Sequence, residues 1–279
     1  MGSEMCIRDS SVTAKAGQED TKLSFKAAYG WHDWTVNPDF NEIGGTIGAY
    51  WVARTWKWEF FTGQNEPGGP DDIAYFYESE GDYRLKAKAA TPDYFNWIHC
   101  AGATQGWVWD SSPPNGLFQP TPLQITSAIG QLKSKTNLIT YTHANYATWG
   151  VLSDIWFKVY HVYDSRNHVY FNGILGIDFY YDAMNSFLYD GCFRALGSTM
   201  VYTKMPSPAP GTGWTTFDIL QALIEAQQAA SRNQLYFDIS NCWLYEAEVL
   251  VEEANGMWVI AKYSYFNVYY FETGTITGL

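Results

Sequence analysis

The sequence is poor in long apolar runs and in charged residues. No stretch of about 18 consecutive apolar residues occurs, so nothing in it is a candidate for a membrane-spanning helix. Charged residues make up only 16% of the 279 positions, and the 29 acidic residues outnumber the 17 basic ones. The resulting net charge of -12 repels phosphate groups, which argues against nucleic acid and leaves a neutral ligand compatible. We expect a monomer that binds neither nucleic acid nor a membrane.

Cysteine is also scarce, and the common catalytic and cofactor motifs are missing. Outside the first ten residues only Cys100, Cys192 and Cys242 occur, with no CxxC pair and no cysteine–histidine spacing typical of zinc. One disulfide plus a free thiol would fit this number, and so would three buried thiols. The sequence lacks HxH, HExxH and GxSxG, and no glycine-rich loop opens a helix after a strand. It therefore predicts no metal site, no nucleotide site and no serine triad, and we expect no cofactor.

The first residues differ in character from the rest of the chain. "MGS" resembles an expression leader, and "MCIRDS" (5–10) resembles a translated sequencing adapter. Such an origin would make the gene metagenomic or transcriptomic, with its 5′ end truncated. We therefore expect a leader and non-native or disordered segment over 1–22 and a single β-sandwich domain over 23–279. We expect secretion, although no signal peptide is visible.

The remaining chain is dominated by strand-like patterns. Segments such as "DIWFKVYHVY" (154–163) and "GMWVIAKYSYFNVYYF" (256–271) alternate with period two or are rich in β-branched and aromatic residues. Turn-rich breaks at 62–72, 110–116 and 204–213 are short and have strand-like segments on both sides, which is typical of loops rather than of linkers. Many strands separated by turns favour an all-β sandwich or barrel.

One helix is predicted, late in the chain, over about 215–231. Its apolar stripe consists of Phe217, Ile219, Leu220, Leu223 and Ile224. Either Thr215 or Thr216 can cap its start, which would place Asp218 in the first turn. The segment "LQITSAIGQL" (123–132) fits either a helix or a strand face. The fold class predicted is therefore all-β, with two sheets and one late α-helix.

Several segments together resemble the glycoside hydrolase family 12 endoglucanases. "YGWHDWTVN" (29–37), "GAYWVARTWKWEFFTG" (48–63), "LITYTHANY" (138–146) and "VLSDIWFKV" (151–159) follow one another in the order of that family's strands. The helix and the following "NQLYFDIS" (233–240) resemble its closing segment. The resemblance covers roughly residues 25–270 and implies a jelly roll of two curved sheets that hydrolyses β-glucan. The family's motif of a nucleophilic Glu before an apolar pair and Trp is not reproduced, because "GILGIDFYYD" (173–182) contains no Glu.

The resemblance implies a pair of carboxyl groups, which a retaining glycosidase holds about 5–5.5 Å apart. Asp178 is the candidate nucleophile, and it shares a strand face with Gly176 and Tyr180. A glycine beside it would leave room for a sugar. The alternatives are an Asp on a solvent-facing strand surface, or one hydrogen-bonded to a neighbouring Tyr.

The candidate acid lies after the helix, where Glu246 and Glu248 share one face of a predicted strand. Two buried neighbouring carboxylates repel each other, which favours one in the cleft and one at the edge, and the alternative is a solvated strand face. Glu252 and Glu253 are expected in a charged turn before "ANG". Asp154 matches the family's third acid, which helps to set the nucleophile's protonation state; its alternative is a solvent-facing Asp.

Thirteen tryptophans supply candidate sugar-stacking surfaces. Trp56 and Trp58 lie two apart, so on a strand they point to the same side, and Trp107 and Trp109 form a second such pair. The predicted platform consists of Trp31, Trp34, Trp56, Trp58, Trp107 and Trp109. The alternative is burial, because sheets favour aromatic residues and sandwich cores bury them.

Three functions stay open at this point. The first is an endo-acting hydrolase of a β-glucan-type polysaccharide with a retaining two-carboxylate mechanism. The second is a non-catalytic carbohydrate-binding protein on the same scaffold, and the third is a β-barrel that binds an apolar small molecule. Acids at Asp154, Asp178 and Glu246 or Glu248 favour the first, whereas the missing Glu motif favours the second.

Overall fold

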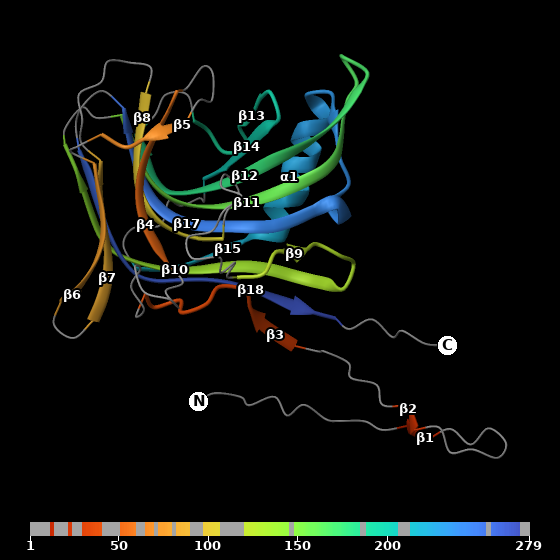
Figure 1. The fold of residues 1–279 in the computed structure, drawn as a ribbon, viewed down its shortest axis with the longest axis horizontal. Helices are drawn as coiled ribbons and strands as arrows, with labels where there is room; N and C mark the ends of the chain where they lie inside the picture. Colours follow the sequence, from red (N-terminus) through yellow and green to blue (C-terminus); the bar gives the residue numbers. More distant parts are fainter. Residues whose placement is uncertain are drawn as a thin grey trace.

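A computed structural model describes thirteen segments of the chain: residues 12–13, 22–23, 30–40, 51–59, 65–69, 72–79, 82–89, 97–106, 120–144, 148–184, 188–205, 213–254 and 258–273. These residues form two large β-sheets and one α-helix, which confirms the predicted fold class (Figure 1). A separate pair of two-residue strands, β1 (Val12–Thr13) and β2 (Lys22–Leu23), lies near the N-terminus. No helix in the described segments has the length and apolar character needed to cross a membrane.

The smaller sheet has six strands in the order β15-β10-β18-β7-β6, with β3 paired to β18. They are β3 (Gly30–Asp33), β6 (Ile73–Ser79), β7 (Asp82–Ala89), β10 (Ile129–His143), β15 (Gly213–Asp218) and β18 (Val259–Glu272). The side chains of one face of β10 are buried, namely Leu132, Ser134, Thr136 and Leu138. This period-two alternation directs one face of the sheet to the core and the other to solvent.

The larger sheet has ten strands, eight of them in the order β13-β14-β12-β11-β17-β8-β4-β5. They are β4 (Val52–Glu59), β5 (Asn65–Pro67), β8 (Trp97–Gly106), β11 (Thr148–Asp164), β12 (Val169–Met184), β13 (Phe193–Leu196), β14 (Thr199–Lys204) and β17 (Cys242–Ala254). The short strands β9 (Leu123–Gln124) and β16 (Leu235–Tyr236) pair with β17 and β11. The segment 123–132 is therefore strand and turn, and not helix.

The ten-stranded sheet curves, and the six-stranded sheet lies outside the curve (Figure 1). The main core fills the space between them and includes Trp51, Phe157, Phe179 and Tyr263. A second, smaller apolar cluster lies on the opposite face of the larger sheet, with Cys100, Leu152, Tyr180, Leu188 and Leu250 at its centre. Both faces of the central strands are thus covered. We call the face with the second cluster the concave face.

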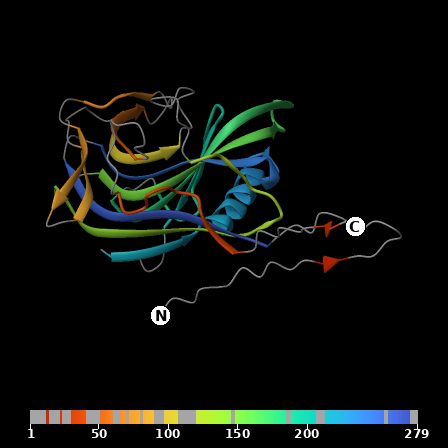
Figure 2. The same cartoon turned by 60° about the horizontal axis from the view of Figure 1, so that its bottom comes forward.

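The helix α1 (Ile219–Arg232) begins four residues later than predicted. Residues 213–218 extend strand β15 along β10 instead, because pairing with β10 satisfies their backbone groups. Asp218, and not a threonine, is the N-cap, and its side chain accepts a hydrogen bond from the Gln221 amide. The buried stripe is mostly alanine: Ile219, Ala222, Leu223, Ala226, Ala229 and Ala230. In both views the helix lies at the end of the sandwich away from β6 and β7 (Figure 2).

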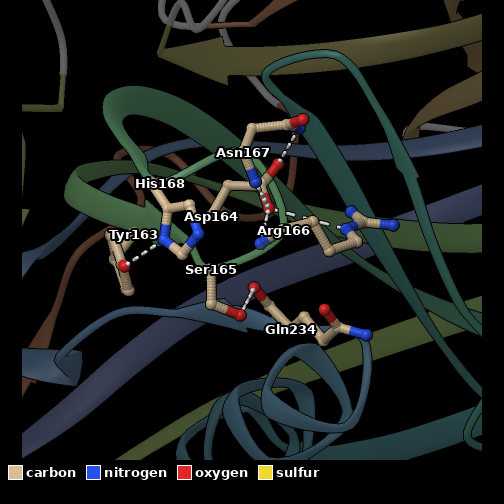
Figure 3. Close-up of polar contacts among 7 residues, drawn as sticks. All are labelled: Tyr163, Asp164, Ser165, Arg166, Asn167, His168 and Gln234. Atoms are coloured by element: carbon tan, nitrogen blue, oxygen red, sulfur yellow. Dashed lines mark hydrogen bonds and ion pairs between the residues drawn. The ribbon is translucent and has the colours of Figure 1, made fainter.

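The hairpin between β11 and β12 is organised by one aspartate. The Oδ1 atom of Asp164 accepts hydrogen bonds from the backbone amides of Arg166 and Asn167, and its Oδ2 atom accepts one from the Asn167 side chain (Figure 3). Ser165 donates to the carbonyl of Gln234, just after the helix. The turn is therefore tied to the C-terminal end of α1.

The cysteines of the described segments are three buried thiols, at positions 100, 192 and 242. This corresponds to one of the two arrangements left open by their number.

Candidate active site

A cavity opens on the concave face of the ten-stranded sheet. Four carboxyl groups line it, from Asp154, Asp178, Glu248 and Glu252, and so do the indoles of Trp56 and Trp58. They share one face because each strand exposes every second residue on the same side. The cavity therefore brings together three of the four predicted catalytic residues and two of the six predicted stacking residues.

Three of the carboxyl groups form a row across adjacent strands. Asp178 on β12 lies directly opposite Asp154 on β11, and Asp154 lies directly opposite Glu248 on β17. Asp178 and Glu248 are therefore two strand spacings apart, about 9.5 Å at the backbone. All three are at most 7% exposed. Buried carboxylates this close cannot all be ionised at low energetic cost, so protons must be held within the row.

Asp154 is the central member of the row, and its surroundings favour the protonated form. Burial raises its pKa well above the usual range, and the charges of Glu248 and Asp178 and a hydrogen bond with Glu248 add to this. The Oδ1 atom of Asp154 has no hydrogen-bond donor among the described residues. A proton on Asp154 that points to Glu248 would satisfy both groups. In this structure Asp154 thus supports Glu248 rather than facing solvent.

Asp178 is the second protonated group. Burial first, and then the charge of Glu252, raises the pKa of Asp178 to about 8, against an opposing effect of the Arg194 guanidinium. An aspartic acid with this pKa holds its proton at neutral pH. Such a group can donate a proton to a leaving oxygen, which is the property that a general acid needs.

Glu248 has a positively polarised group near each of its two carboxyl oxygens. Its Oε1 atom accepts a hydrogen bond of 3.2 Å from the Trp156 indole, and its Oε2 atom lies 3.5 Å from the Arg54 guanidinium. These two contacts fix the position of Glu248 beside Asp154 in the row.

Glu246 does not line the cavity. It is fully buried and forms an ion pair of 2.6 Å with Arg54, which reaches across from β4. The expectation that one of Glu246 and Glu248 would lie at the sheet edge is therefore wrong, because both are buried. Arg54 makes this possible, and the charges of Glu246, Glu248 and Asp154 outweigh burial and raise its pKa. The sequence pattern carried no signal for this partner.

Glu252 is a cavity residue that sequence reasoning assigned elsewhere. Strand β17 continues to Ala254, so Glu252 and Glu253 are buried strand residues and not a charged turn. Glu252 accepts a short hydrogen bond from the Tyr180 hydroxyl. Burial raises the pKa of Glu252, although Tyr180 and Arg194 act against it. The sequence did contain a signal for this position of Glu252. Glu252 is four residues from Glu248, so on one continuous strand the two side chains share a face.

The sequence had suggested that Gly176 leaves space for a ligand beside Asp178. The structure shows that this space is filled by the Trp156 ring. A side chain at Gly176 would meet the ring of Trp156 at 2.7 Å. The glycine therefore accommodates Trp156, which packs over β12 and donates to Glu248. Its small size serves the positioning of a neighbouring side chain.

The predicted tryptophan platform is only partly assembled. Trp56 and Trp58 lie at the cavity, with Arg54 over the first indole and Arg194 5.8 Å from the second. Trp34 is buried in the main core, where its indole donates to the Thr121 carbonyl, and Trp31 lies on β3 in the other sheet. The stacking role of both at this cavity is therefore wrong. Trp107 and Trp109 lie outside the described residues.

Side chains from distant strands of the curved sheet meet at the cavity. Arg194 on β13 and Trp58 on β4 belong to strands near opposite ends of the sheet order, yet they are in contact. The cavity volume is about 90 Å³, and Arg194 is one of its lining residues. Ligand sites commonly measure about 300–1,000 Å³, so the cavity is small for a sugar ring.

The cavity shows no arrangement suited to a metal ion. Within the described segments, no group of three or more His, Cys, Asp or Glu side chains is placed to hold one.

Comparison with known proteins identifies similar structures only. No protein-family model matches the sequence, and no curated protein does. A metagenome-derived family 12 endoglucanase matches with a TM-score of 0.45 at 17% identity, over 80% of this chain and 97% of that one. An endoglucanase from Rhodothermus marinus matches with a TM-score of 0.43 at 15% identity, over 79% of this chain and 100% of that one. The xyloglucanase domain of a Sinorhizobium fredii type three effector, in complex with cellobiose, matches with a TM-score of 0.36 at 13% identity, over 88% and 99%.

The fold is similar to that of family 12 glycoside hydrolases. Because the identities and TM-scores are low, we take no activity and no residue role from these structures.

Proposed function

We propose that this protein is a glycoside hydrolase that acts on a β-glucan-type polysaccharide. The observation that carries the proposal is the row of Asp178, Asp154 and Glu248 across three adjacent strands, next to Trp56 and Trp58. Buried carboxyl groups with perturbed pKa values in a cavity are typical of catalytic sites. Indoles at the same cavity supply flat apolar surfaces on which sugar rings stack.

The electrostatics favour a division of roles opposite to the one expected from the sequence. Asp178 holds a proton, so it is the proposed acid; Glu248, which accepts a hydrogen bond from Trp156 and lies beside the Arg54 guanidinium, is the proposed nucleophile. Asp178 would give its proton to the glycosidic oxygen as the carbon–oxygen bond breaks, while a Glu248 oxygen bonds to the anomeric carbon. Asp178, now ionised, would then take a proton from a water molecule, whose oxygen displaces Glu248 and restores both groups.

Asp154 and Arg54 are proposed as positioning residues for Glu248. A proton on Asp154 directed at Glu248 keeps the nucleophile from repelling its neighbours, and Arg54 balances its charge. Glu246 serves as the buried counter-ion that fixes Arg54. In this assignment Glu246 is not a catalytic residue.

The proposal is tested by reducing-sugar release from soluble β-glucan. Asp178→Asn and Glu248→Gln should each lower the rate by at least about a thousandfold, the scale at which catalytic carboxylates contribute. Asp190→Asn, which alters an exposed ion pair with Lys204, serves as the matched control and should keep full activity. Hydrolysis that persists in both cavity variants would overturn the proposal.

Azide distinguishes the two roles. A Glu248→Ala variant leaves space for azide to attack the anomeric carbon. Azide should therefore restore the activity of this variant on an activated glucoside. Should azide rescue Asp178→Ala by forming the inverted glycosyl azide, and not Glu248→Ala, the roles are those expected from the sequence.

A non-catalytic carbohydrate-binding protein is the second candidate. It is favoured by an Asp where a Glu was expected on β12. Glucan binding without any hydrolysis by the unaltered protein would decide for it. Binding of an apolar small molecule, and no glucan, would instead favour the apolar side of the cavity, formed by Leu152, Val201 and Leu250.

A further inference from the structure

The outer face of the six-stranded sheet carries exposed aromatic residues that the cavity does not use. Trp31 on β3 is 48% exposed, and Trp214 on β15 is 59% exposed. Both side chains are exposed and belong to the side of the sheet that points away from the core. Large indoles left in solvent on a sheet face indicate a contact surface for another molecule.

The register of the strands places these rings in one diagonal row. Trp214 and Tyr265 both lie opposite Asn137, and their rings are 5.1 Å apart. Trp31 lies opposite Phe271, and its ring is 5.1 Å from Tyr269 and 5.4 Å from Phe271. We call these five residues the outer aromatic row. Six residues along β18 and three strand spacings separate its ends, so it spans about 24 Å.

Hydrogen-bonding groups of both signs lie between the rings. The register places Lys133, Lys135 and Asp33 on the same face, and Asn267 holds Asp33 through a hydrogen bond of 2.7 Å. Lys135 lies over Trp214 at 4.4 Å, and Lys133 lies over Trp31 at 5.6 Å. The aromatic row is therefore flanked by both hydrogen-bond donors and acceptors.

We propose that the outer aromatic row is a binding site for an extended, uncharged polysaccharide chain. The flat apolar faces of its sugar rings would stack on the indoles and phenol rings. Its hydroxyl groups would find partners among Lys133, Lys135 and Asp33. The site lies on the sheet opposite the cavity face, so it can hold the polymer while the cavity acts on another part of it, and it does not require the protein to be catalytic.

The charges of the protein favour an uncharged polysaccharide over anionic and cationic ligands. A net charge of -12 repels nucleic acids and acidic polysaccharides. A cationic ligand would have to displace Lys133 and Lys135, which already lie over the two indoles. The length of the row, about 24 Å, exceeds a single sugar and fits several units of a chain.

Native electrophoresis through gels that contain soluble β-glucan tests the proposal. The unaltered protein and Asp178→Asn should be retarded equally, because the row lies apart from the cavity. The Trp31→Ala/Trp214→Ala double variant should show roughly tenfold weaker retention, the effect of two lost aromatic contacts. Tyr170→Ala, which alters another exposed ring at the β11–β12 hairpin, is the matched control and should be retained fully.

Two further measurements separate the possible outcomes. Trp58→Ala alters the cavity only, so a loss of retention in Trp58→Ala and not in the double variant would overturn the proposal. Light scattering gives the oligomeric state: a dimer that becomes a monomer in the double variant would overturn it in favour of a protein interface. Trp31→Tyr/Trp214→Tyr keeps aromatic faces and should restore most retention. Retention that depends on the row, without any hydrolysis, would uphold the site and remove the proposed catalytic function.

Discussion

Arg54 on β4 and Glu246 on β17 form an ion pair of 2.6 Å across the intervening strand β8. Glu246 has no exposed surface, and the Arg54 guanidinium balances its charge. The same guanidinium lies 3.5 Å from Glu248. One arginine therefore allows two glutamates to occupy the buried part of a single strand face.

Replacing Arg54 should lower the stability of the protein more than a substitution at the surface does. Arg54→Met leaves Glu246 buried without its counter-ion, and we expect a loss of about 3–5 kcal/mol in the free energy of unfolding, measured in urea. Adding Glu246→Gln should recover part of this loss, because the stranded charge is then gone. Equal stability of Arg54→Met and the unaltered protein would show that the pair contributes nothing.

Gly176→Ala tests whether Trp156 needs the space that the glycine leaves. The added methyl group would meet the Trp156 ring at 2.7 Å, so the indole must move and its hydrogen bond to Glu248 must weaken. We expect about 1–3 kcal/mol of destabilisation by thermal unfolding, together with reduced glucan hydrolysis. Unchanged values of both quantities would mean that the indole has room to adjust.

The stability of the protein should fall with pH because of Asp178. Its pKa is about 8 in the folded protein and about 3.9 in an unfolded chain, so the folded state binds the extra proton between these values. The stabilisation is fully present below about pH 4 and is lost as pH rises toward about 8. Asp178→Asn removes this dependence, so its stability relative to the unaltered protein should rise by up to a few kcal/mol across that window.

Thermal melts at several pH values provide the measurement for Asp178. Asp190→Asn, which alters an exposed carboxylate, should follow the unaltered protein at every pH. A difference between Asp178→Asn and the unaltered protein that stays constant with pH would show that Asp178 has an ordinary pKa.

Trp58 should report ligand entry by its fluorescence. In the Trp31→Ala/Trp214→Ala variant, which lacks the indoles of the outer aromatic row, a short gluco-oligosaccharide that stacks at the cavity should change the emission, and adding Trp58→Ala should remove most of that change. Trp258→Ala removes a partly exposed indole at the start of β18 and should keep it. A full response in Trp58→Ala would place the ligand elsewhere.

The configuration of the first product decides between the two hydrolytic mechanisms. If Glu248 is the nucleophile, the anomeric centre is displaced twice, and NMR of early time points should show the β-anomer. An α-anomer would mean that water attacks directly, with the carboxyl groups about 6.5–9.5 Å apart. The backbone spacing of two strands is compatible with either outcome, because side-chain direction sets the final separation.

Much of the fold was determined by local sequence pattern. Period-two alternation predicted the strands, and a 3.6-residue apolar period predicted one late helix, because side-chain direction follows directly from these repeats. The helix start was misplaced because Thr215–Phe217 satisfy their backbone groups by pairing with β10, and a local pattern contains no information about that partner. The face shared by Glu246 and Glu248, and that shared by Trp56 and Trp58, were also predictable from spacing alone.

Only the tertiary structure decided which residues from other strands pack against those strand faces. Glu252 was assigned to a turn because its sequence neighbours are polar, yet pairing with β8 and β11 extends β17 past it and curvature buries it beside Tyr180. Arg54 and Glu246 are 192 positions apart in the sequence, so no local pattern links them. Trp31 lies far from the cavity that Trp58 lines because β3 pairs with β18 of the other sheet. The spacing of residues along a strand sets which way each side chain points. Which strands become neighbours, and hence which charges are buried together, depends on the pairing of distant segments, and this is settled by the summed free energy of the whole sheet.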